Sequence, residues 1–345
     1  MRKKKIFLGG YINHINAQNI NCKSIAKHLD KEKYIIKTLV LGSENIPSIS
    51  RVSYIRVSTF LYSVSNLIAF LRAVLWADVC YVPKHQSTPK IALKIASLVR
   101  TKLFTTIEGN MCDTSKRNMI NSFGSLDKMK RYFSLIPNVF GITNYIVENA
   151  TCGINFQKES LSLGVEKNMF HHEIKRESLR NIIFIGSLVK TKDINEFIEL
   201  AVSFPEITFN VVGSGPEKEF LKNASGSNVV FHNRLNHQEL SVFLRNMDLH
   251  FLPSKSEGFP KVVLETASSS VPSIVYDSYG ASEWISDYNN GFIVSDFSQV
   301  KSLVSELKEN PKILEDCSVK VSELAERFDW KKVINQWEEV IEELK

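Results

Sequence analysis

Short apolar runs alternate with amphipathic stretches along the whole chain of 345 residues. Continuous apolar runs are typical of strands buried on both faces, whereas apolar residues three and four positions apart are typical of helices. We therefore predict strands at 5–9, 35–41, 52–57, 79–82, 102–107, 139–142, 181–185, 207–212, 229–231, 249–252, 273–275 and 291–294. Helices are predicted between them, at 19–29, 63–76, 89–99, 126–133, 194–203, 217–222, 237–246, 261–269, 281–286 and 297–309.

This alternation, repeated in both halves, predicts the α/β class with two Rossmann-like domains, each a parallel sheet covered by helices. We expect an N-terminal domain at 1–165, a polar linker at 166–180 and a C-terminal domain at 181–329. Residues 330–345 form an amphipathic pattern that predicts a last helix packing back on the body; two heptads are too few to favour a coiled coil. Ligands of open α/β sheets bind at the carboxyl ends of strands, so the expected site is a cleft faced by both domains.

Two apolar segments resemble membrane signals. Residues 61–77 are near spanning length, but they include Asn66 and Arg72, which favours a buried or interfacial helix. The start MRKKKIFLGGYI imitates a signal peptide, but its apolar part is too short. We expect a charged N-terminus that leads into the first strand.

Composition narrows the class of protein. Hydrophobic residues make up 43% of the chain and charged residues 23%, which is typical of a folded protein and not of a disordered one. The five cysteines are scattered and form no metal-binding spacing. This pattern predicts a reducing, cytoplasmic location, with no zinc site and no disulfide framework. No Asp-x-Asp motif stands out, so no metal is expected on a phosphate ligand.

The positive charge is concentrated in the first half. Residues 1–170 contain 24 Lys and Arg against 10 Asp and Glu, whereas residues 171–345 contain 19 against 27. Such a basic half suggests an anionic partner. No basic-aromatic motif points to nucleic acid, so we expect an anionic membrane surface, with a merely solvated positive surface as the alternative.

The stretch SEGFPKVVLE carries candidate chemistry, because Glu257 and Glu265 flank a loop and the start of a helix. A helix N-terminus offers free N–H groups and partial positive charge, which suit a phosphate or a sugar hydroxyl. Glu265 would hold a ribose diol and Glu257 a sugar hydroxyl, with Gly258 allowing close approach. The structural alternative is an ordinary strand–loop–helix turn in which Glu257 is a capping acid.

This stretch and three others, in order, resemble the retaining glycosyltransferases of family 4, which have the GT-B fold. EGFPKVVLE resembles the family's E-x7-E segment, and FIGSLVKTKD, NVVGSGPE and VVFHNRLNHQELSVFLRNMDLHFLPS resemble the segments before it. In the first half the likeness is looser, at IFLGG, FGITNYI and SLGVEKNMF.

The resemblance implies roles for individual residues. Glu257 would contact the transferred sugar, and Lys192 would neutralise the departing diphosphate, so both are the catalytic candidates. Glu265 would bind the ribose, and a Gly9–Gly10 turn would close on the phosphates. With Asn233, Arg234 and Leu235 as candidates for the base, the donor-binding set is Gly9, Gly10, Gly186, Ser187, Asn233, Arg234, Leu235, Gly258, Phe259, Pro260 and Glu265.

Two positions depart from the family pattern. Ser187 stands where the family has an arginine, and Glu108 stands where many members have a histidine near the reacting sugar. Two other features favour plain structural roles: Gly213-Ser214-Gly215 is interpreted as a turn, and His85 as a loop histidine that alternatively lines the acceptor side.

The sequence therefore predicts a retaining, metal-independent glycosyltransferase without a cofactor. It would move a sugar from a UDP- or GDP-sugar to a glycan, lipid-linked and part of surface polysaccharide or lipopolysaccharide synthesis, at the inner face of the membrane. Two alternatives stay open: a GT-B scaffold that has lost catalysis and binds a partner, motivated by Ser187 and Glu108, and a sugar-nucleotide epimerase.

Overall fold

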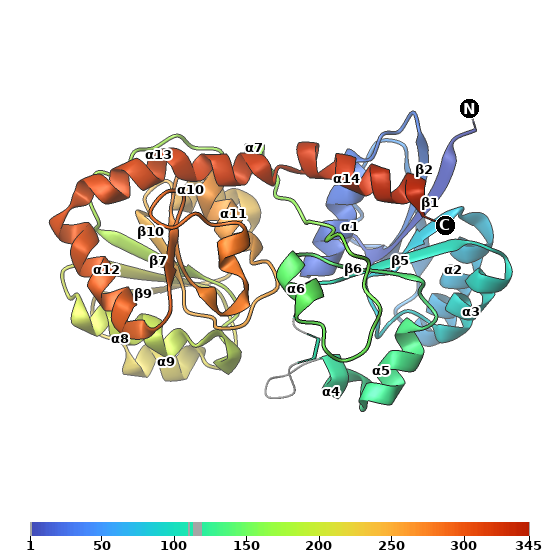
Figure 1. Cartoon of the computed structure of the whole chain (residues 1–345), viewed down its shortest axis with the longest axis horizontal. Helices are drawn as coiled ribbons and strands as arrows, with labels where there is room; N and C mark the ends of the chain where they lie inside the picture. The colour runs from blue at the N-terminus through green and yellow to red at the C-terminus, as the bar shows by residue number, and fades with distance from the viewer. Residues whose placement is uncertain (1, 110, 113–118, 345) are drawn as a thin grey trace. The chain divides into compact units, whose positions relative to one another are not determined.

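The computed structural model describes residues 2–109, 111–112 and 119–344. Two compact units make up the chain. Unit 1 consists of Met1–Gly164 together with Trp330–Lys345, and unit 2 of Val165–Asp329. Each unit is described by itself below (Figure 1).

Unit 1 contains a six-stranded parallel sheet in the order β3-β2-β1-β4-β5-β6. Its strands are β1 (Lys4–Tyr11), β2 (Tyr34–Leu41), β3 (Val52–Val57), β4 (Val79–Tyr81), β5 (Lys102–Ile107) and β6 (Asn138–Gly141). Its helices are α1 (Ala17–His28), α2 (Tyr62–Trp76), α3 (Lys90–Leu98), α4 (Met119–Phe123), α5 (Leu126–Phe133), α6 (Asn144–Glu148) and α14 (Trp330–Glu343). Parallel strands need a crossover connection, and here a helix joins most pairs of consecutive strands.

Unit 2 repeats this plan with a second six-stranded parallel sheet in the order β12-β11-β10-β7-β8-β9. Its strands are β7 (Asn181–Ile185), β8 (Thr208–Val212), β9 (Val229–His232), β10 (Leu249–Leu252), β11 (Ser273–Tyr276) and β12 (Phe292–Val294). Its α-helices are α7 (Lys167–Phe170), α8 (Ile194–Ser203), α9 (Lys218–Ala224), α10 (His237–Leu244), α11 (Lys261–Ser268), α12 (Phe297–Glu309) and α13 (Pro311–Arg327), and η1 (Lys190–Lys192) is a single 3-10 turn.

The predicted α/β class with two parallel sheets is confirmed, and each predicted strand has an observed counterpart within a few residues of its bounds. The largest error is the missing helix α13, although its buried Leu314, Cys317, Val321 and Leu324 have helical spacing. The predicted helix at 281–286 is only a 3-10 turn at Ala281–Glu283.

Gly9 and Gly10 do not form the predicted turn. They lie inside β1, which continues to Tyr11, and the register with β2 shifts between Leu8 and Tyr11 as in a β-bulge. A Cβ on Gly10 would lie 2.6 Å from the sulfur of Cys22 on α1, and one on Gly9 would lie 3.0 Å from the Tyr81 carbonyl oxygen. The turn prediction is therefore wrong: the strand continues through both glycines, and Gly10 leaves room for α1 to pack on it.

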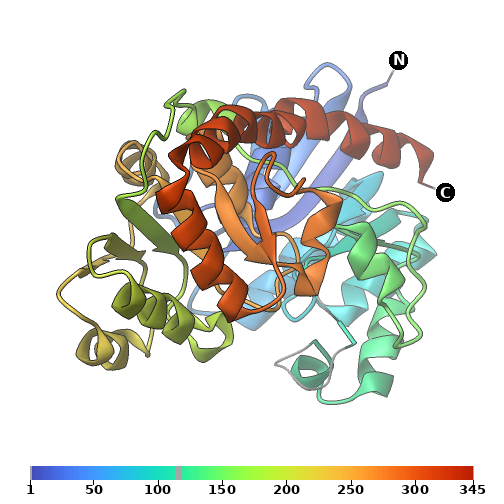
Figure 2. The same ribbon diagram turned by 60° about the vertical axis from the view of Figure 1, so that its left-hand side comes forward.

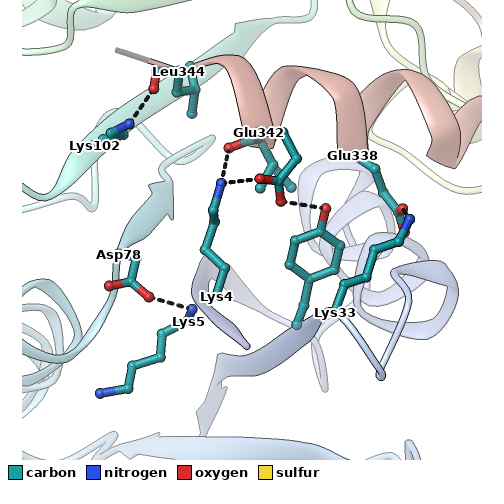
Figure 3. Close-up of polar contacts among 10 residues, drawn as sticks. Lys4, Lys5, Lys33, Asp78, Lys102, Glu338, Glu342 and Leu344 are labelled. Carbon is teal, nitrogen blue, oxygen red and sulfur yellow. Dashed lines mark hydrogen bonds and ion pairs between the residues drawn. The ribbon is translucent and has the colours of Figure 1, made fainter. Parts of the chain in front are cut away.

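The last helix, α14, returns to unit 1, where it lies beside α1 (Figures 1 and 2). Trp337 is fully buried there, with its ring 5.0 Å from that of Tyr81, and its indole N–H donates to the Ser162 carbonyl at 2.9 Å. The same helix forms partly exposed ion pairs with unit 1, including Lys4–Glu342 at 2.6 Å and Lys33–Glu338 at 2.9 Å (Figure 3). The predicted amphipathic helix thus packs on its own chain.

Residues 166–180, predicted to be a linker, are grouped with unit 2. Arg176 explains this placement, because its buried guanidinium donates to four backbone carbonyls, those of Leu244, Arg245, Ser269 and Ser270. These carbonyls lie at the C-terminal ends of α10 and α11, where the helix dipole favours a cation. Burial lowers the pKa of Arg176 to about 10.

The sequence predicted no disulfide framework and gave no sign of the disulfide that joins Cys112 and Cys152. Cys22, Cys80 and Cys317 are buried and form no disulfide. Forty residues separate the two bonded cysteines, so sequence spacing gave no sign of their pairing. Among the helices of the described residues, none is long and apolar enough to cross a membrane.

Candidate functional site

The order of the strands in unit 2 defines where a ligand site is expected. From β7 the chain continues to β8 and β9 on one side, and β10 then returns to the other side of β7. The connections that follow β7 and β10 therefore diverge above the carboxyl ends of these neighbouring strands. This topological switch point is the position at which open α/β sheets bind ligands.

Lys192 and Glu257 meet at this switch point. Lys192 belongs to η1, in the connection after β7, and Glu257 to the loop after β10; their side chains form an ion pair. Their side chains are only 27% and 12% exposed, so the pair is partly shielded from water. The two predicted catalytic residues, 65 positions apart, are thus neighbours.

The side chain of Phe259 anchors the loop that follows β10. Its ring packs 5.2 Å from Trp284 and 4.9 Å from Phe328, and Gly258 and Pro260 are also buried. Pro260 is the residue before α11, which begins at Lys261. The aromatic anchor fixes the backbone of this loop just ahead of the N-terminus of α11.

Glu265 lies inside α11 and its side chain is only 14% exposed. Burial raises the pKa of its carboxyl, and the nearby side chains of His237, when protonated, and Lys261 oppose that rise. His237 Nε2 lies 3.7 Å from Glu265 Oε1. The sequence gave no reason to couple His237 to this site, because the pairing depends on the packing of α10 against the rest of unit 2.

Asn233, Arg234 and Leu235 lie in the short connection from β9 to α10. Asn233 and Arg234 are exposed, and Lys218 donates to the Asn233 carboxamide oxygen at 2.9 Å. Asn236 then caps α10 in a capping box with Glu239. These contacts order the connection, while its proposed role in binding a base stays a prediction.

Gly186 and Ser187 follow β7, with Ser187 exposed. This connection packs directly on Gly213-Ser214-Gly215: Leu188 donates to the Ser214 carbonyl at 3.0 Å, and a Cβ on Gly215 would lie 2.2 Å from the Leu188 oxygen. Gly213 and Gly215 are therefore required by the packing of the two backbones, as expected of a turn and not of a dinucleotide-binding site.

Unit 1 has a pocket of about 730 Å³ at its own switch point, where β1 and β4 are neighbours. It is lined from the connections after these strands by Asn16, Gln18, Lys84 and His85, and from after β5 by Glu108. The departure from the family pattern, Glu108, thus lines the pocket and accepts a hydrogen bond from Asn21 at 3.1 Å.

His85 is a pocket residue and not a plain loop histidine. It is buried, with Nε2 2.7 Å from the Thr105 hydroxyl and its ring 4.9 Å from Phe133. Burial lowers the pKa of His85 to about 3, so the ring is neutral at physiological pH. Across the described residues, no group of three or more His, Cys, Asp or Glu is arranged to hold a metal ion.

The family model of the glycosyl transferases group 1 matches residues 164–323, nearly the whole of unit 2. This part of the chain therefore has the sequence pattern of the group 1 glycosyltransferases. The putative teichuronic acid biosynthesis glycosyltransferase TuaC of Bacillus subtilis is 30% identical to this chain over 175 residues, which cover 47% of this chain and 44% of TuaC. The matches to the first curated relatives span about half of their length or less.

Solved structures agree with this match at the level of fold. Sucrose-phosphate synthase from Thermosynechococcus elongatus has a TM-score of 0.79 at 13% identity, covering 99% of both chains. Anabaena HepE in complex with UDP and glucose has a TM-score of 0.75 at 16% identity, covering 99% of this chain and 100% of HepE. The chain therefore has the predicted GT-B fold.

Proposed function

We propose that this chain is a retaining glycosyltransferase that moves a sugar from a nucleoside-diphosphate sugar to a glycan acceptor. The observation that carries the proposal is the Lys192–Glu257 pair at the switch point of unit 2, in the same unit as the buried Glu265 on α11. A cation for a diphosphate, an acid for a sugar and an acid for a ribose are the groups that such a donor requires.

Lys192 supplies the leaving-group stabilisation. As the bond between the anomeric carbon and the diphosphate oxygen breaks, negative charge grows on the phosphate, and a partly buried ammonium stabilises that charge more than water does. Lys190, exposed in the same turn, is the nearest candidate for the second cation that Ser187 does not provide.

Glu257 and the backbone amides of Gly258 and Phe259 bind the sugar, while Glu265 accepts hydrogen bonds from the ribose. The acceptor hydroxyl attacks the anomeric carbon from the face that the diphosphate leaves, and its proton passes to a leaving phosphate oxygen. No separate base and no metal is required by this scheme. A UDP-sugar is the first donor to test, because HepE binds UDP and glucose.

The acceptor binds in the pocket of unit 1, where Glu108, neutral His85, Gln18 and Lys84 offer hydrogen-bonding groups for sugar hydroxyls. We propose a lipid-linked glycan of surface polysaccharide synthesis, at the cytoplasmic face of a membrane. The basic charge of the first half and the name of TuaC support this acceptor class.

The test is donor binding and donor hydrolysis by the purified chain. UDP- or GDP-sugars should raise Tm, since binding to the folded state stabilises it by mass action. Slow hydrolysis of the stabilising donor should fall at least about a hundredfold in Lys192→Ala. Lys301→Ala is the matched control, because it also removes a lysine paired with a glutamate of unit 2, Glu199 at 2.7 Å.

The outcomes separate the alternatives. A catalytically inactive scaffold would bind a nucleotide sugar without hydrolysing it, and an epimerase would release an isomerised nucleotide sugar without any acceptor. Equal hydrolysis by Lys192→Ala and the wild type would refute the role of Lys192.

A further inference from the structure

The exposed apolar side chains of unit 1 concentrate on two helices that pack side by side, α2 and α3 (Figure 1). Phe60 is 92% exposed and Leu98 81%. We define the α2–α3 face by its large exposed apolar residues, which are Phe60, Leu61, Val64, Ile68, Leu75, Ile91, Leu98 and Val99. Elsewhere in the described part of unit 1, only Ile15 and Ile35 are large, apolar and exposed.

Helix α2 is apolar on two opposite sides. Ala69, Phe70, Ala73 and Val74 are buried, and they form the side that covers the unit's own core. Leu61, Val64, Ile68 and Leu75 follow one another at helical spacing on the outer side. A helix of a soluble monomer normally presents polar residues there. The outer stripe therefore points to a partner outside the monomer.

The charge on this face is of one sign. Neither α2 nor α3 contains an Asp or a Glu, whereas Arg72, Lys90 and Lys94 are exposed on them. Unit 1 as a whole has 26 Lys and Arg against 13 Asp and Glu. Apolar residues flanked by cations are typical of surfaces that bind anionic lipid. Two copies of this face would instead bring the same cations together and repel each other.

The α2–α3 face begins at the rim of the pocket in unit 1. Tyr62, the first residue of α2, lines the pocket directly after Phe60 and Leu61. Gln86 and Ser87 line it shortly before α3 begins. An apolar surface seated in a bilayer along these helices would thus hold the pocket next to the lipid headgroups.

We propose that the α2–α3 face docks unit 1 on an anionic lipid bilayer, so that the pocket receives its acceptor from the membrane. The acceptor part rests on the proposed function, whereas docking on lipid does not. Vesicle binding without any nucleotide, and nucleotide-induced shifts in Tm without any vesicle, therefore test the two separately.

The experiment is vesicle flotation of the full chain with phosphatidylcholine vesicles that contain or lack phosphatidylglycerol. We expect binding only to the vesicles that contain phosphatidylglycerol, and weaker binding as the Debye length falls from about 10 Å at 0.1 M salt to about 3 Å at 1 M. Lys90→Glu/Lys94→Glu should lower the partition coefficient at least about twentyfold, at about fivefold for each cation lost. Ile68→Ser/Leu75→Ser should lower it at least about tenfold.

Each double variant has a matched control. Lys23→Glu/Lys27→Glu changes the net charge equally, on exposed positions four residues apart on α1. Val202→Ser/Val242→Ser removes two exposed apolar residues of unit 2. Both controls should bind vesicles as the wild type does.

Three results would overturn the proposal. The first is no binding to phosphatidylglycerol, and the second is an equal loss of binding in the α1 and α3 charge variants. The third is a dimer in sedimentation velocity that Ile68→Ser/Leu75→Ser dissociates, without any vesicle binding. That result would make the α2–α3 face an interface between two copies.

Discussion

Lys192 and Glu257 neutralise each other, although both are assigned to the donor. A donor diphosphate must therefore compete with Glu257 for the ammonium of Lys192. If Glu257 in turn accepts a sugar hydroxyl, the two side chains exchange partners when the donor binds. The exchange requires the negative charge of the Glu257 carboxylate, and not only its ability to accept a hydrogen bond.

Glu257→Gln tests that assignment. The amide keeps the shape of the side chain, so Tm should stay close to that of the wild type, while turnover should fall at least about a hundredfold. Glu199→Gln is the control, because it makes the same change in the surface pair with Lys301 and should leave turnover unaltered. Near-normal turnover in Glu257→Gln would mean that another carboxylate contacts the sugar.

Glu265→Gln should stabilise the protein at neutral pH. Burial raises the pKa of Glu265, so the folded state binds its proton more tightly than the unfolded state does. The cost of the buried charge is then complete above the raised pKa and disappears below about pH 4.5, the ordinary range for a glutamate. The Tm advantage of Glu265→Gln should therefore shrink as the pH falls through this range.

Glu323→Gln, at an exposed position of α13, should show no such dependence on pH. A Tm of Glu265→Gln below that of the wild type at neutral pH would mean that attraction to His237 outweighs the cost of burial. Measurement of both variants by thermal unfolding at a series of pH values distinguishes these cases.

Helix α14 is held on unit 1 by apolar contacts and ion pairs of unequal strength. Trp337 fills the space between Tyr81 and Phe104, with ring separations of 5.0 and 6.0 Å. In each of the two ion pairs of the same helix one partner, Lys33 or Glu342, is mostly exposed, so water and salt weaken the pairs. We therefore assign the docking of α14 to its apolar side, with the ion pairs of Figure 3 contributing mainly to its register.

Trp337→Ala should cost about 3–5 kcal/mol, because it leaves a large cavity that the sheet cannot fill. Lys33→Ala, which removes the ion pairs of an exposed lysine with Glu338 and Asp30, should change stability far less. Hydrogen exchange should locate the loss in the strands of unit 1. Equal destabilisation by both variants would contradict the dominance of the apolar contact.

The sequence predicted best those features that depend on a single strand, loop or helix. Buried parallel strands are continuous apolar runs, so their positions could be predicted closely, and E-x7-E located the loop and helix that hold Glu257 and Glu265. Contacts between distant elements were not predictable. The approach of His237 to Glu265, the disulfide between Cys112 and Cys152, and the tight packing of Gly9 and Gly10 all depend on tertiary structure.

At the scale of the whole chain, unit 2 is inserted into unit 1 between Gly164 and Trp330. Its two ends lie together: the Val165 N–H donates to the Phe328 carbonyl at 2.9 Å, and Val165 and Asp329 form an isolated bridge. Adjacent ends are the condition under which an inserted domain folds without strain on its surroundings.

A fragment of residues 165–329 should therefore fold alone and show a nucleotide-dependent rise in Tm. Residues 1–164 should not fold stably, because they lack Trp337, whereas 1–164 joined to 330–345 through a Gly-Ser linker should recover folding. Circular dichroism and thermal unfolding check all three fragments. An unfolded 165–329 fragment would show that unit 2 needs the rest of the chain.

The paired ends of unit 2 also offer a route to engineering. Since the chain enters and leaves this unit at neighbouring residues, Val165 and Asp329, a single contiguous graft with two closely spaced junctions would replace the whole of unit 2, including Lys192, Glu257 and Glu265. Chimeras of this kind would join unit 1 of this chain to the corresponding unit of a different glycosyltransferase.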